Sequence, residues 1–137
     1  MTGLLVDTGF LVALFKPDDR QRARARAFVQ SNHLPLVTVS PVIVETCFFL
    51  RSKQKQGLLE WVQRGALGVA DVPAGAYPAI GAIIGKYADR NIDFADAALV
   101  WLAAETGVRD ILTVDETDFG VYRLKAGKRF TLVKWLA

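Results

Sequence analysis

The amino-acid sequence predicts an α/β protein with a three-layer α/β/α arrangement and a central parallel sheet of about five strands. Two observations support this prediction: short apolar runs of strand length alternate with segments of helical periodicity, and acidic residues follow several of these runs. Strands separated by helices pair in parallel through right-handed crossovers, so helices should cover both faces of the sheet. The 137 residues fall within the size of one domain, so residues 1–137 are expected to fold as one unit.

The first half of the chain shows strand and helix signals in alternation. A buried apolar run ends at Asp7, a helical pattern stops ahead of Pro17, and the pair Ser40-Pro41 is typical of a helix start. The predicted elements are a strand at 4–6, a helix at 8–15, an arginine-rich helix at 19–31, a strand at 36–39 and a long helix from Ser40 to Gln54.

The second half continues this alternation. Gly107 is placed to end a helix, because glycine readily adopts the left-handed conformation that follows a last helical turn. The segment DETDF at 115–119 has the composition of a turn. The predicted elements are helices at 57–65, 76–89 and 93–105 and strands at 69–72, 111–114 and 130–133.

The composition excludes several classes of protein. Apolar residues make up 52% of the chain, which argues against disorder, and charges interrupt every apolar stretch before it reaches the about 20 residues that span a bilayer. Asp7 interrupts the N-terminal apolar stretch and no basic leader precedes it, so no secretory signal is expected. Cys47 is the only cysteine, which suits a reducing cytoplasm. We therefore expect a cytoplasmic protein that does not enter a membrane.

Basic residues are in slight excess and fall into two clusters. Lysine and arginine total 17 against 14 acidic residues, a net charge of +3 that permits binding to a polyanion without requiring it. A first cluster consists of Arg20, Arg22, Arg24 and Arg26, which alternate with other residues. In one helix, at about 100° per residue, the side chains of Arg20 and Arg24 would point nearly opposite to those of Arg22 and Arg26. The second cluster follows Asp115 closely and is better placed to hold phosphates, although a solvated basic face explains it equally well. Its members are Arg123, Lys125, Lys128, Arg129 and Lys134.

Four acidic residues occupy similar local positions far apart in the sequence. Asp7 and Asp115 follow predicted strands, and Asp96 lies in the first turn of a predicted helix whose apparent N-cap is Asp93. Each has an ordinary structural explanation, because aspartate is favoured at helix N-termini and in turns. Glu45 is harder to explain, because its neighbours are apolar and no basic residue lies within one turn of it. Unpaired burial of such a carboxylate would cost several kcal/mol or force its protonation.

The four acids gain significance as a set. Open α/β sheets form their sites at the carboxyl ends of parallel strands, so Asp7 and Asp115 would converge if the first and fourth strands were neighbours. Converging carboxylates repel one another unless a cation lies between them, and hard divalent ions such as Mg²⁺ or Mn²⁺ suit oxygen ligands. His33 is the only histidine, so neither a pair of catalytic histidines nor a His/Cys zinc site is expected.

Four segments, in this order and at these separations, resemble the PIN-domain nucleases, in particular the small single-domain proteins related to VapC toxins: LLVDTGFLVALF, PVIVETCFFL, DFADAALVWLAAETG and ILTVDETDFGVYR. The resemblance covers nearly the whole chain. It implies a PIN-like (Rossmann-like) fold, a cluster of three or four acids that holds Mg²⁺ or Mn²⁺, and endonucleolytic cleavage of single-stranded RNA. The acids that it implies as catalytic and metal-binding are Asp7, Glu45, Asp96 and Asp115.

Further polar residues are candidates for supporting roles. Residues that could orient the metal ligands are Thr8, Asp93, Thr113 and Asp118. Arg123 and Lys125 are candidate RNA contacts, and Tyr122 could either stack on a base or pack in the core. Gly9 departs from the family pattern, because many relatives carry a small polar residue at that position.

Partners are implied by the resemblance more than by the residues. Small VapC-like proteins are usually homodimers neutralised by an antitoxin protein that covers the acidic cleft, so we expect a homodimer, an antitoxin and an RNA substrate. The predicted helix at 76–89 carries Ile80, Ile83 and Ile84, which could form the dimer contact or belong to the core.

Two other functions fit parts of the sequence. An aspartyl-phosphate hydrolase needs a second aspartate two residues after Asp7, where Gly9 stands, and a phosphorylated receiver needs an acid at a middle strand end and a late lysine that are not evident. A catalytically silent PIN-like module that only binds RNA or protein predicts the loss of an acid. All four acids are present.

Overall fold

The computed structural model describes residues 2–136 and contains one parallel sheet of five strands in the order β3-β2-β1-β4-β5. The strands are β1 (Leu4–Val6), β2 (Leu36–Val39), β3 (Gly68–Ala70), β4 (Asp110–Leu112) and β5 (Thr131–Leu132). All four pairings between neighbouring strands are parallel. The predicted parallel sheet of about five strands is therefore confirmed.

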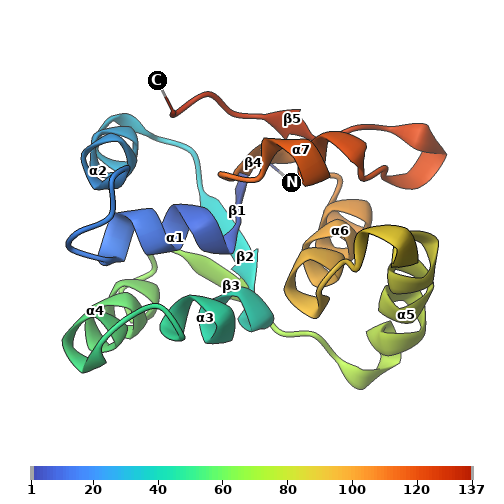
Figure 1. Cartoon of the computed structure of the whole chain (residues 1–137), viewed down its shortest axis with the longest axis horizontal. Coiled ribbons are helices and arrows are strands. Elements are labelled where there is room, and N and C mark those ends of the chain that lie inside the picture. Colours follow the sequence, from blue (N-terminus) through green and yellow to red (C-terminus); the bar gives the residue numbers. More distant parts are fainter. Residues whose placement is uncertain (1, 137) are drawn as a thin grey trace.

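Helices cover the sheet in two groups that Figure 1 shows on opposite sides of the strands. The helices are α1 (Thr8–Phe15), α2 (Arg22–Ser31), α3 (Ser40–Cys47), α4 (Ser52–Gln63), α5 (Tyr77–Lys86), α6 (Phe94–Thr106) and α7 (Glu116–Val121). Helix α1 packs against α2, α3 and α4, and α6 packs against α5; α3 also contacts α6 and so joins the two groups. Among residues 2–136, no helix has the length and apolar character needed to cross a membrane.

The sheet order places a switch point between β1 and β4. The chain leaves β1 toward β2 and β3 on one side and returns to β4 and β5 on the other. The backbone N–H of Asp7 donates to the carbonyl of Leu112 at 3.0 Å, which ties the carboxyl ends of the two strands together. In open α/β sheets, ligands bind in the crevice at this position.

A continuous apolar core supports this crevice. Every residue of β1 is buried, and α6 is buried on most sides because its small residues, such as Ala97 and Ala98, allow close approach to the sheet. Phe10 of α1 packs edge-to-face against Phe28 and Trp135, with ring centroids 6.1 and 4.8 Å away. These contacts hold the first turn of α1 firmly beside β1.

The predicted long helix from Ser40 to Gln54 is wrong. Helix α3 ends at Cys47, and α4 begins at Ser52 and absorbs most of the predicted helix 57–65. Two features favour the break. The hydroxyl of Thr46 donates to the carbonyl of Val42 at 2.7 Å, a side-chain bond that competes with helical hydrogen bonding. Leu50 is buried and Arg51 is extended, so the chain is turned back to the core before α4 starts.

The predicted helix at 19–31 begins three residues later than expected. Helix α2 starts at Arg22, because the carboxylate of Asp19 accepts a hydrogen bond from the N–H of Gln21 at 2.8 Å and forms a local turn. Arg20 therefore lies outside the helix. The expectation that Arg20 points the same way as Arg24 is wrong for this reason.

Further boundaries also differ from the prediction. The predicted helix 76–89 is a shorter α5 between two 3₁₀ turns, Ala74–Ala76 and Ala88–Arg90. The predicted strand 111–114 ends at Leu112, and the turn-like DETDF forms the short helix α7. In α5, Ile80 is buried in the core, and Ile83 and Ile84 pack partly buried against it. These isoleucines therefore belong mainly to the core.

Candidate active site

A cleft of about 590 Å³ lies at the switch point, and all four predicted acids line it. Asp7 follows β1, Glu45 comes from α3, Asp96 from α6, and Asp115 from the segment between β4 and α7. Asp93, at the start of α6, lines the same cleft. Asp19, ahead of α2, also lines the cleft, so segments far apart in the sequence bring six carboxyl groups to one place.

Asp7 is buried at the floor of the cleft and serves two neighbours. One carboxylate oxygen accepts from the backbone N–H of Thr8 at 2.7 Å, which caps α1. The other accepts from the hydroxyl of Thr113 at 2.8 Å. Capping and site geometry are therefore not alternatives for Asp7, because each uses a different oxygen of the same carboxylate.

Thr113 joins two of the acids. Its hydroxyl donates to Asp7 and accepts from the backbone N–H of Asp115 at 2.9 Å. Its carbonyl accepts from the indole N–H of Trp135 at 3.1 Å. The orientation of Asp7 relative to the Asp115 backbone is thus fixed by a single buried side chain, which the C-terminal segment holds in place.

Asp93 and Asp96 share the start of α6. The Asp93 carboxylate caps the helix by accepting from the backbone N–H of Asp96 at 2.8 Å, which confirms the predicted N-cap. The carboxylate of Asp96 accepts from the phenol of buried Tyr122 at 3.4 Å. Burial, followed by the charge of Asp96, raises the pKa of the Tyr122 phenol, so the phenol stays a proton donor.

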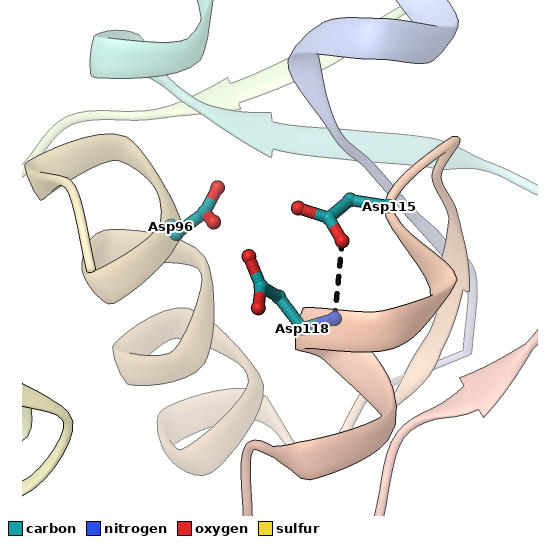
Figure 2. Close-up of side chains that lie close together, drawn as sticks. All are labelled: Asp96, Asp115 and Asp118. Carbon is teal, nitrogen blue, oxygen red and sulfur yellow. Dashed lines mark hydrogen bonds between the residues drawn. The ribbon is translucent and has the colours of Figure 1, made fainter. Parts of the chain in front are cut away.

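Asp115 and Asp118 lie on one side of a group of three acids, and Asp96 faces them from the other side (Figure 2). Asp115 caps α7 by accepting from the backbone N–H of Asp118 at 3.0 Å. Asp118 accepts from the guanidinium of Arg90 at 2.6 Å. Arg90 comes from the 3₁₀ turn after α5, so a positive side chain from a distant segment partly neutralises the negative charge of Asp115 and Asp118.

Glu45 is less buried than its apolar neighbours led us to expect. Its side chain is half-buried at the side of the cleft, and adjacent Val44 and Phe48 are exposed. The apolar sequence around Glu45 therefore forms surface as well as core. Burial raises the pKa of the Glu45 carboxyl, and the nearby Thr8 hydroxyl, which has no hydrogen-bond partner among residues 2–136, opposes this rise.

Burial, together with the crowding of carboxyl groups, raises the pKa values of the acids in the cleft. Burial, with the nearby charges of Glu45 and Asp93, raises the pKa of Asp7 from 3.8 to about 7, against the opposing hydrogen bonds from Thr113 and Thr8. Burial, then the charge of Asp7, raises the pKa of Asp96 to about 9. Burial also raises the pKa values of Glu45 and Asp115. A cation bound in the cleft would favour the charged forms of these carboxyl groups.

The ligand atoms present suit a hard divalent cation. One carboxylate oxygen from each of Asp96, Asp115 and Asp118 lies within 4.8 Å of the others. All of these donors are oxygen atoms, which Mg²⁺ and Mn²⁺ prefer. Asp118, predicted only as an accessory residue, therefore stands as close to Asp96 and Asp115 as a direct ligand would. Helices α1, α6 and α7 begin at Asp7, Asp93 and Asp115, which line the cleft, so the positive N-terminal ends of these helices lie beside it.

The two candidate RNA contacts lie elsewhere. Neither Arg123 nor Lys125 lines the cleft. The guanidinium of Arg123 donates to the carbonyls of Gly120, Val121 and Tyr122 at 2.9, 2.7 and 3.1 Å, so it satisfies the end of α7. Tyr122 is buried and packs against Phe119, with ring centroids 5.1 Å apart; its predicted alternative as a core residue is correct.

Several residues of the site were not predicted from the sequence. Arg20 and Phe49 line the cleft, and Arg90 pairs with Asp118. Arg20 could have been found from the Asp-Arg-Gln turn that precedes α2. The position of Arg90 depends on Asn91 in the left-handed conformation, with φ of 51°, and on packing of distant segments, so no local pattern indicates it.

Comparisons with known proteins agree with this architecture. A family model described as PIN domain matches residues 4–123. The chain is 31% identical over 135 residues to Ribonuclease VapC26 from Mycobacterium tuberculosis (strain ATCC 25618 / H37Rv), covering 95% of this chain and 99% of that protein. The crystal structure of Mycobacterium tuberculosis VapC20, described as a Sarcin-Ricin loop cleaving toxin, matches with a TM-score of 0.73 at 19% identity, over 80% of this chain and 87% of that chain. The likeness to VapC20 concerns the fold.

Proposed function

The chain belongs to the PIN-domain family, and on that premise we propose that it is a metal-dependent endoribonuclease that cleaves single-stranded RNA and acts as the toxin of a toxin–antitoxin pair. Its similarity to a curated ribonuclease over nearly its whole length supports the reaction. Its use of Mg²⁺ or Mn²⁺ and the assignment of residues 1–137 to one nuclease domain are parts of the same proposal.

One observation carries the proposal: Asp7, Glu45, Asp96 and Asp115 line a single cleft at the switch point of the sheet. A structural explanation accounts for the acids one at a time, since Asp7 and Asp115 cap helices. It does not account for their convergence, which raises the pKa of Asp96 through burial and repulsion. Carboxyl groups that repel one another in the metal-free protein are suited to hold a cation, because the cation would neutralise this repulsion.

The acidic residues of the cleft would have different roles in the reaction, according to their positions. Asp96 and Asp115, with Asp118 beside them, would hold the cation, and Asp7 would complete the negative floor of the cleft. When bound, the cation lowers the pKa of a water molecule and neutralises charge on the scissile phosphate. Glu45, half-buried with a raised pKa caused first by burial, is suited to orient the attacking water and accept its proton.

Supporting residues keep these groups in place. Thr113 holds Asp7 in one orientation, and Asp93 fixes the first turn of α6 that presents Asp96. Arg90 restrains Asp118 by an ion pair with an N–O distance of 2.6 Å. Such partners set the direction of the ligands around a metal.

Exposed apolar side chains support the proposed protein partners. Val44, Phe48 and Phe49, at the end of α3 and after it, are 58%, 80% and 56% exposed. Phe49 also lines the cleft. Apolar surface of this kind, next to a catalytic cleft, is suited to burial by an antitoxin segment or by a second copy in a homodimer.

Cys47, the only cysteine in the chain, fits the reducing cytoplasm in which we place the protein.

The proposal is tested by cleavage of generic single-stranded RNA by the purified protein. We expect cleavage with Mg²⁺ or Mn²⁺, none with EDTA, and a loss of at least about a hundredfold in Asp7→Asn and Asp96→Asn. Both substitutions leave the side chain nearly the same size. Asp71→Asn is the matched control, because Asp71 is exposed and lies outside the cleft. Cleavage that survives EDTA and both substitutions would contradict the assignment.

A further inference from the structure

A second hollow of about 550 Å³ adjoins the acidic cleft on the side of α2. The two depressions share Asp19 and Arg20, so they are continuous at the turn that precedes α2. The second hollow then follows α2 past Arg22 and Arg26. We propose that this arginine hollow binds the phosphates of the RNA strand that flank the cleavage site. The inference rests on the proposed function, which it extends by naming the path of the substrate.

The charge of the arginine hollow is opposite to that of the cleft. Arg20, Arg22 and Arg26 line it against a single acid, Asp19. Asp19 accepts a hydrogen bond from the backbone N–H of Gln21, so part of its carboxylate is already engaged. The arginines provide positive charge beside the acidic cleft, which would attract the phosphates of a strand that enters it.

Two of these arginines are free to bind a ligand. Arg20 and Arg26 are exposed and take part in none of the ion pairs or side-chain hydrogen bonds found among residues 2–136. Arg22 instead donates to the carbonyl of Leu14 at 3.4 Å, so it anchors α1 to α2 and contributes charge. A guanidinium offers a planar fork that matches phosphate oxygens.

The late start of α2 creates this arrangement. Because α2 begins at Arg22, Arg20 lies in the preceding turn and reaches both the cleft and the arginine hollow. Arg22 and Arg26 are one helical turn apart, about 6 Å along the axis. Arg24, between them, lines neither depression. The arginines therefore form a line that leads away from the acids along one face of α2.

The lining also indicates what part of the RNA is recognised. Apart from its charged residues, the arginine hollow is lined by Ala23, Ala27 and Gln30, with no aromatic side chain on which a base could stack. Contacts here would be to phosphates and so would carry no base preference. We therefore expect the arginine hollow to add affinity for any single strand long enough to reach it.

The test is RNA binding without cleavage. A fluorescently labelled oligouridylate strand is titrated with the full-length protein in EDTA at several salt concentrations, for wild type, Arg20→Gln, Arg26→Gln and Arg24→Gln. We expect Arg20→Gln and Arg26→Gln each to raise Kd about threefold to tenfold and to reduce the salt slope by about 0.7, the value for one phosphate contact on a single strand.

Arg24→Gln is the matched control, because it removes the same charge from the same exposed helix. It should change Kd by less than about twofold. Equal weakening in all three variants would show a general charge effect and overturn the proposal. No weakening in Arg20→Gln and Arg26→Gln, or no binding of oligouridylate by the wild type at low salt, would also overturn it.

The outcome separates this inference from the proposed function. If the wild type cleaves RNA with Mg²⁺ and the arginine variants bind oligouridylate like Arg24→Gln, the ribonuclease stands and the path along α2 is wrong. If the arginines contribute to binding but no metal-dependent cleavage occurs, the path stands and the ribonuclease is wrong.

Discussion

Val114 lies directly over Gly9: a Cβ built on Gly9 would be 2.2 Å from Cγ2 of Val114. No pair of nonbonded carbon atoms tolerates that distance, so any larger side chain at position 9 would require Val114 to shift. Val114 immediately precedes Asp115, and Gly9 lies in the first turn of the helix that Asp7 caps. The contact therefore sets the spacing between two of the acids.

Gly9→Ala should destabilise the protein by about 1–3 kcal/mol, the usual cost of overpacking. Val114 has to move, and Asp115 moves with it, so metal-dependent cleavage should fall as well. Val114→Ala removes the clashing methyl groups and should restore much of both losses in the double variant. Urea unfolding and cleavage rates of the four proteins in the double-mutant cycle measure the coupling. Additive effects would contradict a direct contact.

Thr113→Val should reduce cleavage more than its loss of stability explains. Valine keeps the shape of threonine, but it leaves an oxygen of Asp7 and the N–H of Asp115 without their partner. The loss of the donor should raise the pKa of Asp7 further above about 7 and so weaken metal binding at neutral pH. We expect a destabilisation of about 1–3 kcal/mol.

The control for Thr113→Val is Thr38→Val. Thr38 is also buried, and its hydroxyl donates to the carbonyl of Val6 at 2.7 Å without touching an acid. It should cost similar stability and leave cleavage unchanged at a temperature where both variants are folded. Equal losses of activity in the two variants would mean that Thr113 acts through stability alone.

The metal-free protein should lose stability as the pH rises from about 4 to about 9. Burial raises the pKa of Asp7 from 3.8 to about 7 and that of Asp96 to about 9. In this window the unfolded chain has released protons that the folded protein still binds, so a rise in pH favours unfolding. Thermal unfolding in EDTA across the window measures the slope.

Asp96→Asn should flatten this pH dependence and raise the free energy of unfolding by about 1–3 kcal/mol at pH 8, because it removes a buried group that resists ionisation. Mg²⁺ should stabilise the wild type at pH 8 and stabilise Asp96→Asn much less. A metal-free protein whose stability rises with pH would refute the proposed crowding of the carboxyl groups.

Arg123→Ala should lower stability and spare RNA binding. Its guanidinium donates to three carbonyls at the end of α7, so its loss should cost about 1 kcal/mol. Lys125→Ala, two residues away, should change neither property. The same oligouridylate titration and urea unfolding measure both variants. A higher Kd for Arg123→Ala at unchanged stability would restore its sequence-based assignment as an RNA contact.

The features that the sequence predicted well are those with strong local signals. Asp7 follows a fully buried strand, Asp93 caps α6, and Gly107 ends it in the left-handed conformation, with φ of 77°. Each of these depends on residues within one helical turn. The parallel pairing of the strands followed from the rule for crossovers, whereas the adjacency of the first and fourth strands was a condition of the prediction, which the structure meets.

The features that it missed depend on tertiary packing. The apolar residues around Glu45 predict a buried helix, whereas Phe48 and Phe49 are exposed and α3 ends between them and Glu45. Helical periodicity predicts a helix from residue 19, although the Asp19 side chain forms a turn that excludes Arg20 from α2. Hydropathy does not distinguish a core side chain from one that a partner would cover.

The acids that cap α1, α6 and α7 have a consequence for evolution. Asp7, Asp93 and Asp115 each begin a helix with one carboxylate oxygen. A descendant that no longer cut RNA would still gain folding stability from them, and drift would erode Asp96 and Glu45 first, since neither starts a helix. Descendants that have lost RNA cleavage should therefore be recognised by the residues at positions 45 and 96, not by the aspartates that begin the helices.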